Sequence, residues 1–351
     1  MKHVIVYKEP GRFCGWPANN GVWNWDGNEI LVGFSLGTFR EQKGHNIEDP
    51  ILSVLARSVD GGESWVMYDP QDFVGDGGEA TDPPGDIDFS NPDLALRVTG
   101  IGFHGNVDPR GGYFASQDRG VSWSGPFKFS GLLDDPRIKG FEMTPRTDTL
   151  ALSASDCLFF LSARDPSIKI KMHDRAFCAR TSDGGASFRF CGWIVGFDDP
   201  YRGVMPSTVR MLNGSLVSAV RRRRGAEQYC WVDAYASDDL GETWRLAGKV
   251  GDTGTSNGNP PALVALSDGR VCCVYGNRDR REMIARLSAD GGLTWGEEVV
   301  LRDDFQADAH DDADFGYPRV VQRGDGRLVA MYYWATRENI EHHIAATIWE
   351  P

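Results

Sequence analysis

The chain has 351 residues, of which 41% are hydrophobic and 25% charged, and its formal net charge is −13. This acidity argues against a nucleic-acid partner, because proteins that bind the phosphate backbone need surplus lysine and arginine to displace counterions. No apolar stretch approaches the ~18 residues of a membrane-spanning helix, which argues against a membrane partner. The 42 glycines, 18 phenylalanines and 11 tryptophans instead indicate many short strands joined by tight turns.

The amino-terminal segment contains only a short apolar run at 4–6, far too short for the core of a signal peptide. The seven cysteines are odd in number and include no Cys-x-x-Cys pair. Such cysteines fit reduced thiols better than a disulfide framework. These features predict a cytoplasmic chain.

A short motif, Ser/Thr-x-Asp-x-Gly-x-Ser/Thr-aromatic, recurs along the chain. Its Asp and Ser/Thr side chains are suited to bind the backbone of a turn, its Gly to take a positive φ, and its aromatic ring to pin the turn to neighbouring strands. The copies lie 51 to 65 residues apart, which matches a propeller blade of four short strands. The five copies are at 58–65, 116–123, 181–188, 237–244 and 288–295.

A second repeat is a proline that precedes a strand-like run in each of six segments. Proline suits the first residue of a strand, where no ladder donor is needed, and it favours an extended residue before it. The repeat therefore predicts six innermost strands, each opening at its proline. The prolines are Pro17, Pro92, Pro145, Pro206, Pro260 and Pro318.

The last of the six segments ends before a fourth strand or a sixth motif. The missing strand is predicted to be the amino-terminal run at 3–8, because closing the last blade with it removes the open sheet edge. The whole chain, 1–351, is then a single all-β domain, a six-bladed β-propeller.

The five motifs resemble the Asp-box, or BNR, repeat of the sialidase superfamily over essentially the whole chain. The Asp-box is a structural clasp, so function must be argued from residues at the mouth of the propeller. Sialidases use an arginine triad for the substrate carboxylate, a tyrosine nucleophile activated by a glutamate, and an aspartate acid/base. The resemblance implies that Tyr317 is the nucleophile and Asp49 the acid/base. It also implies that Arg221 and Arg281 are triad arginines, with Arg278 able to substitute.

Further side chains are predicted to line the mouth and bind substrate. Amide and aromatic groups on the first inner strand suit a sugar ring, and additional arginines suit a carboxylate, because the guanidinium fork makes two charge-assisted bonds at once. A histidine on the loop before Tyr317 is either a base or a solvated loop residue. These residues are Asn19, Asn20, Trp23, Arg40, Arg146 and His310.

Two positions depart from the sialidase pattern. Gly15 stands where the family has the arginine of its Arg-x-Pro motif, and no carboxylate lies near Met205, where the activating glutamate is expected. The leading hypothesis is an exo-acting, sialidase-like glycoside hydrolase whose partner is an acidic carbohydrate, such as a sialic or uronic acid. A polysaccharide lyase and a non-catalytic glycan-binding propeller remain alternatives. The sequence predicts no cofactor and no metal site, and it leaves the oligomeric state open.

Overall fold

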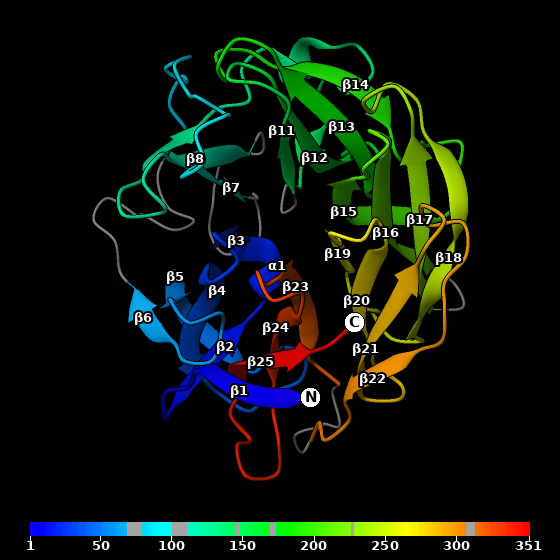
Figure 1. Cartoon of the computed structure of the whole chain (residues 1–351). Helices are drawn as coiled ribbons and strands as arrows, with labels where there is room; N and C mark the ends of the chain where they lie inside the picture. The colour runs from blue at the N-terminus through cyan, green and yellow to red at the C-terminus, as the bar shows by residue number, and fades with distance from the viewer. Residues whose placement is uncertain (69–78, 100–110, 145–147, 169–172, 226–227, 307–312) are drawn as a thin grey trace.

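The computed structural model describes residues 1–68, 79–99, 111–144, 148–168, 173–225, 228–306 and 313–351. These residues form six antiparallel sheets arranged in a ring (Figure 1), which confirms the predicted six-bladed propeller. No helix within the described ranges has the length and apolarity needed to cross a membrane.

The first three blades contain most of the irregular structure. The first comprises β2 (Arg12–Gly15), α1 (Pro17–Asn20), β3 (Val22–Trp25), β4 (Glu29–Phe39), β5 (Ile47–Ser58) and β6 (Val66–Tyr68). The second comprises β7 (Ala95–Thr99), β8 (Gly112–Ser116) and β9 (Ser124–Phe127), and is followed by η1 (Leu132–Asp134). The third comprises β10 (Glu142–Met143), β11 (Thr149–Ala151), β12 (Cys157–Arg164), β13 (Arg175–Thr181) and β14 (Arg189–Trp193).

The last three blades are regular four-stranded sheets. The fourth comprises β15 (Arg202–Arg210), β16 (Leu216–Arg224), β17 (Tyr229–Ser237) and β18 (Arg245–Gly254). The fifth comprises β19 (Ala262–Ala265), β20 (Val271–Asn277), β21 (Glu282–Ser288) and β22 (Val299–Arg302). The sixth comprises β23 (Gly316–Gln322), β24 (Leu328–Trp334), β25 (His343–Trp349) and the amino-terminal β1 (Lys2–Tyr7).

Strand β1 closes the ring, as the sequence predicts. It lies beside β25 (Figure 1). The two strands pair antiparallel, with Lys2 opposite Ile348 and Ile5 opposite Ala345. The chain thus covers the edge that β25 would otherwise expose, and it joins the two ends of the sequence in one sheet.

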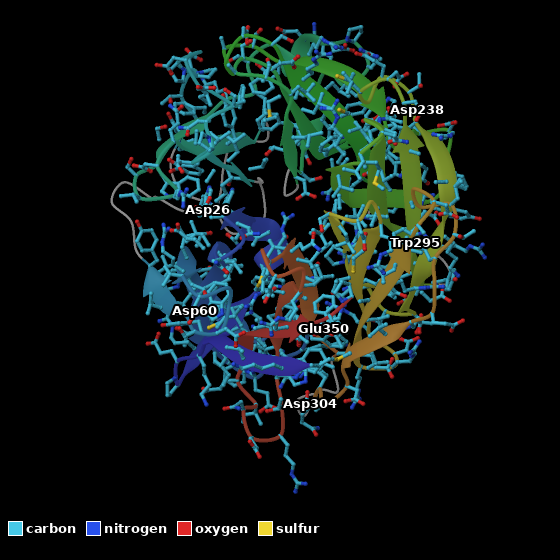
Figure 2. The ribbon with its side chains drawn as sticks, in the orientation of Figure 1. Asp26, Asp60, Asp238, Trp295, Asp304 and Glu350 are labelled. Atoms are coloured by element: carbon cyan, nitrogen blue, oxygen red, sulfur yellow. The ribbon has the colours of Figure 1, made fainter. Side chains whose placement is uncertain are left out.

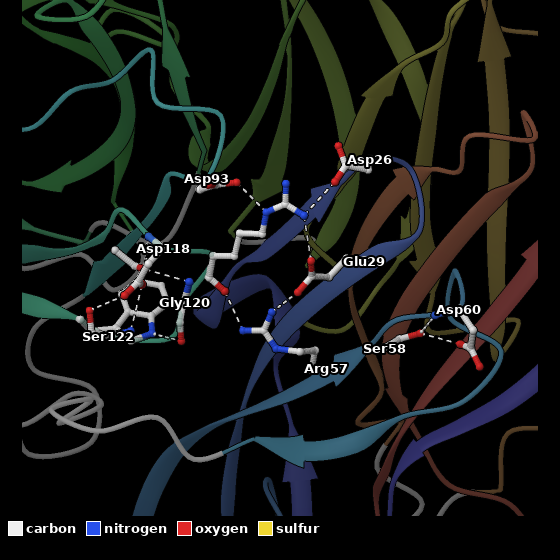
Figure 3. A network of polar contacts seen from close by, with 12 residues as sticks. Asp26, Glu29, Arg57, Ser58, Asp60, Asp93, Asp118, Gly120 and Ser122 are labelled. Carbon is white, nitrogen blue, oxygen red and sulfur yellow. Dashed lines mark hydrogen bonds and ion pairs between the residues drawn. The ribbon is translucent and has the colours of Figure 1, made fainter.

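Each Asp-box clasps a hairpin in the predicted way. In the second box, Ser116 Oγ donates to Asp118 at 2.7 Å and accepts from the Gly120 N–H at 2.8 Å, and Ser122 Oγ donates to Asp118 at 2.6 Å (Figure 3). Trp123 Nε1 then donates to the Gly120 carbonyl at 3.1 Å. The Ser/Thr and Asp bonds recur in the other four boxes. Figure 2 shows Asp60, Asp238 and Trp295, from three of the boxes, at separate positions around the ring.

An ion network joins the first two blades at their boxes (Figure 3). Arg119, inside the second box, donates to Asp93 at 2.6 Å, to Asp26 at 2.8 Å and to Glu29 at 3.0 Å. Arg57 on β5 donates to the Arg119 carbonyl at 2.6 Å and also pairs with Glu29. Apolar packing adds to this cohesion, because the hydrophobic clusters are mostly built from two neighbouring blades each.

Candidate active site

Two β-bulges on inner strands turn side chains toward the mouth of the propeller. The pairing of β15 with β16 shifts between Val204 and Ser207, and that of β23 with β24 shifts between Gly316 and Arg319. A bulge inserts an extra residue and re-aims its side chain. At the two bulges the re-aimed residues are Met205 and Tyr317, and both line one cavity.

The residues that precede the repeated prolines correct the prediction that each of them is extended. Trp16, Met205 and Tyr317 have φ of 56°, 55° and 48°, so they are left-handed and not extended. Two of the strands also begin before their prolines, because Pro206 and Pro318 lie inside β15 and β23, whereas Pro92 and Pro260 precede β7 and β19 as predicted. At Met205 and Tyr317 the physical reason is the bulge, which accepts a proline because its extra residue is outside the ladder. Trp16 instead lies directly before α1. Pro145 lies outside the described residues.

Neighbouring blades satisfy the backbone of each bulge. The Tyr317 N–H donates to Asn259 Oδ1 at 2.9 Å, and the Met205 N–H donates to Ser162 Oγ at 3.2 Å. Asn259 and Ser162 come from the preceding blades and are buried. The position of Tyr317 is therefore set by a contact between two blades as well as by its own strand.

Gly316 should not tolerate a side chain. A Cβ atom there would lie 2.2 Å from Asn259 Oδ1, and the φ of Gly316 is +101°. We expect Gly316→Ala to lower the free energy of unfolding by roughly 2 kcal/mol, since it combines backbone strain with a displaced hydrogen-bond partner. Chemical denaturation would measure the loss. Gly225→Ala is the control, because nothing lies within 4 Å of its added Cβ. Equal stability of the two variants would contradict the expectation.

The cavity beneath Tyr317 has a volume of about 160 Å³ and a cationic lining. Four arginines and one aspartate contribute to it, and they come from blades three to five. Its lining residues are His45, Thr144, Arg164, Asp174, Arg202, Val204, Met205, Arg221, Asn257, Arg278 and Tyr317. An excess of positive charge in a confined space favours an anionic ligand.

Tyr317 is held as a polarised phenol. Its hydroxyl accepts a hydrogen bond from Arg221 Nη1 at 3.0 Å. Arg221 is 6% exposed, and its Nη2 donates to the carbonyls of Asn257 and Gly258. Burial alone would raise the pKa of Tyr317, but the charges of Arg221, Arg278 and His45 outweigh it and lower the pKa to about 7. A phenolate is therefore accessible near neutral pH.

His45 and Asp314 form a hydrogen-bonded pair beside Tyr317. His45 Nδ1 lies 2.8 Å from Asp314 Oδ2, and Asp314 Oδ1 accepts from Tyr333 at 2.5 Å and from Arg278 at 3.4 Å. Burial disfavours both charges, yet the hydrogen bond with His45 and the charges of His45 and Arg278 hold the pKa of Asp314 well below its usual range. Burial also opposes the imidazolium, but the hydrogen bond to Asp314 raises the pKa of His45.

A second buried carboxylate organises the opposite wall of the cavity. The side chain of Asp174 is fully buried and accepts from Arg202 Nε at 2.7 Å and from Arg164 Nε at 3.0 Å. Burial would raise the pKa of Asp174, but Arg202 and Arg164 lower it below its ordinary value. Across the part of the chain that the structure describes, no three His, Cys, Asp or Glu side chains gather as a metal site.

The structure brings three predicted residues together and places a fourth next to them. Tyr317, Arg221 and Arg278 line the cavity. Arg281 lines an adjoining hollow of about 330 Å³, which shares His45 and Arg278 with the cavity.

Two predicted residues of the first blade lie away from this cavity. Asp49 is exposed on β5 and is not among the residues that line the cavity. Arg40 is exposed and pairs with Glu48.

The first inner strand is also not the predicted continuous strand, since α1 interrupts it. Asn19 and Asn20 therefore lie on α1, and Asn20 is buried, donating to the Trp16 carbonyl at 3.2 Å. Trp23 lines a separate axial hollow of about 210 Å³. Arg146 and His310 lie outside the described residues.

Five residues of the site were not among the predicted site residues, although a pattern in the sequence marks one of them, Arg164. Arg164 is the last residue of β12, Arg221 lies near the end of β16, and Arg278 comes directly after β20. An arginine therefore recurs near the end of the second strand in three consecutive blades. No comparable pattern marks the others, which meet only through the fold. The five are His45, Arg164, Asp174, Arg202 and Asp314.

Solved structures share the fold at low sequence identity. A protein of unknown function from Dyadobacter fermentans is 20% identical, with a TM-score of 0.73 over 99% of this chain and 97% of that one. An alpha-L-arabinanase from Penicillium chrysogenum is 13% identical, with a TM-score of 0.64 over 100% and 98%. A sialidase from Streptococcus pneumoniae is 12% identical, with a TM-score of 0.57 over 99% and 70%. Such identities show the fold alone.

Sequence comparison gives the family. No curated protein matches the chain. A family model described as a BNR repeat-like domain matches residues 87–330, which is more than half of the chain. With its five Asp-boxes and six blades, the chain belongs to the BNR repeat-like family and is a sialidase-like β-propeller.

Proposed function

We propose that the chain is an exo-acting glycosidase whose substrate carries a carboxylate, with Tyr317 as the nucleophile at the anomeric carbon. The observation that carries the proposal is the Tyr317 hydroxyl, 3.0 Å from Arg221 inside an arginine-lined cavity. The glycoside hydrolases among proteins of the same fold support the general class.

The lining and size of the cavity support an acidic terminal sugar. The lining contains four arginines, Arg164, Arg202, Arg221 and Arg278, but a single carboxylate, Asp174. Guanidinium groups are the natural partners of a carboxylate. The volume of about 160 Å³ is below the ~300–1,000 Å³ of pockets for drug-sized ligands. A single end unit of a glycan suits such a space.

Tyr317 needs no carboxylate base in this arrangement. Among the described residues, the Tyr317 hydroxyl is bonded to a guanidinium and not to a glutamate. Because the surrounding cations lower its pKa to about 7, the phenolate itself is available to attack. The missing family glutamate near Met205 is thus replaced by electrostatic activation.

A matched panel of aryl glycosides tests the proposal. We expect the protein to release the aryl group from glycosides of sialic or uronic acids, and to act at least ~10²-fold more slowly on neutral sugars of the same ring size, since these offer the arginines no carboxylate. Mass spectrometry would identify the free sugar. Equal rates on acidic and neutral glycosides, or no turnover of any, would contradict the proposal.

A uronate lyase is the second candidate, and the phenolate favours it. In that reaction Tyr317 abstracts the proton at C5, and the arginines neutralise the uronate. The products differ, because elimination creates a new double bond with ultraviolet absorbance whereas hydrolysis does not. Binding of acidic glycans without either product would favour a non-catalytic role.

A further inference from the structure

The cavity and the adjoining hollow meet at three residues. His45, Asn257 and Arg278 line both spaces. If the terminal sugar occupies the arginine-lined cavity under Tyr317, the rest of the substrate leaves through a neighbouring space. Residues shared by both spaces then lie beside the bond that is cleaved.

Of the three shared side chains, only His45 exchanges a proton near neutral pH. An asparagine amide does not titrate, and a guanidinium does not give up its proton in proteins. His45 has 47% of its side chain exposed, so it is accessible to a ligand. Its Nδ1 is occupied by Asp314 at 2.8 Å, which leaves Nε2 as the nitrogen that is free to face substrate.

The ring of His45 is held in place from several elements. Trp16, before α1, contacts it edge-on with ring centroids 5.0 Å apart. Asp314, before β23, supplies the hydrogen bond, and Arg278 and Tyr317 are the other charged or titratable groups that act on it. The net effect of these groups is a raised pKa, which favours the protonated ring that an acid needs.

We infer that His45 is the acid/base of the reaction, that Asp314 is its positioning residue, and that the adjoining hollow receives the leaving group. This inference rests on the proposed glycosidase function. Asp49 then has no catalytic part.

The reaction balances with Tyr317, His45 and one water molecule. The Tyr317 phenolate oxygen bonds to the anomeric carbon as the glycosidic C–O bond breaks, and the leaving oxygen takes the electron pair and the proton from His45 Nε2. Neutral His45 then removes a proton from a water whose oxygen bonds to the anomeric carbon. The bond to Tyr317 breaks, and the phenolate and the imidazolium are restored.

A leaving-group series tests the role of His45. For glycosides of one acidic sugar, we expect His45→Gln to lower kcat/KM by ~10²–10⁴-fold with a poor, basic leaving group. The loss should shrink to about tenfold or less with a highly activated phenol, which departs without a proton. Glu48→Gln, an exposed neighbour in sequence, is the control and should behave as wild type.

The pH dependence tests Asp314. Because Asp314 raises the pKa of His45, Asp314→Asn should move the alkaline limb of kcat/KM to lower pH. Histidine NMR titration of the wild-type protein gives a second reading, and we expect the His45 signal to titrate above the ordinary histidine value. This reading does not depend on turnover or on the folding of a variant.

The outcomes separate the inference from the proposed function. No turnover by the wild-type protein overturns the function and the inference with it. If the wild-type protein turns over substrate but His45→Gln loses the same factor with every leaving group, the inference alone is overturned. A His45 NMR signal that titrates below the ordinary histidine pKa also overturns the inference alone.

Discussion

Tyr317→Phe should lower turnover of an acidic aryl glycoside by roughly 10³-fold or more, because the variant keeps the ring but lacks the attacking oxygen. The loss should appear in kcat, since the arginines that bind the substrate carboxylate remain. Arg221 loses only its bond to the hydroxyl and keeps those to Asn257 and Gly258. Release of the aryl chromophore would measure the effect.

The same variant tests the phenolate. The pKa of Tyr317 is lowered to about 7, so the wild-type protein should show one phenol titrating near neutral pH by ultraviolet difference absorbance. Turnover should rise as pH passes upward through this value, because the phenolate is the reactive form. Tyr7→Phe is the control, since burial and Glu9 raise the pKa of Tyr7. A neutral-pH titration that survives in Tyr317→Phe would remove Tyr317 from the mechanism.

Asp174→Asn should be the most destabilising change in the site, by about 3–5 kcal/mol. The side chain of Asp174 is fully buried and joins Arg164 to Arg202. Neutralising it leaves two partly buried guanidinium groups without their shared counter-charge, whose desolvation is then uncompensated. Urea denaturation near neutral pH would measure the loss.

The pH dependence of this loss has a definite sign. The folded-state pKa of Asp174 is lowered. Its contribution to the free energy of unfolding is therefore complete above the unfolded-state pKa of about 3.9, and it is lost as the pH falls through the folded-state pKa. The difference in the free energy of unfolding between wild type and Asp174→Asn should therefore become smaller only at acidic pH. Asp325→Asn is the control, because Asp325 is exposed, so solvent screens its pairs with Arg327 and Arg323 and little stability should be lost. Similar losses for both variants would contradict the assignment of Asp174 as a buried counter-charge.

The amino-acid sequence by itself determined the architecture. The Asp-box is a local clasp whose side chains bond within eight residues, so each copy reports its own hairpin wherever it stands. The count and spacing of the copies, with the unfilled last blade, then predicted six blades and the closure by β1. Tyr317 and Arg221 were predicted from the resemblance to sialidases, and both line the cavity.

Only the tertiary structure decided how the site is charged and which titratable groups meet in it. His45 and Asp314 are 269 residues apart, and Arg278 reaches Asp314 across 36, so the pair exists only because the ring closes. The bulges were equally hidden, since a proline motif does not reveal whether its preceding residue is extended or left-handed. The physical reason is range: hairpin clasps are satisfied by near neighbours in sequence, whereas the hub of a propeller is made from one short segment of each blade.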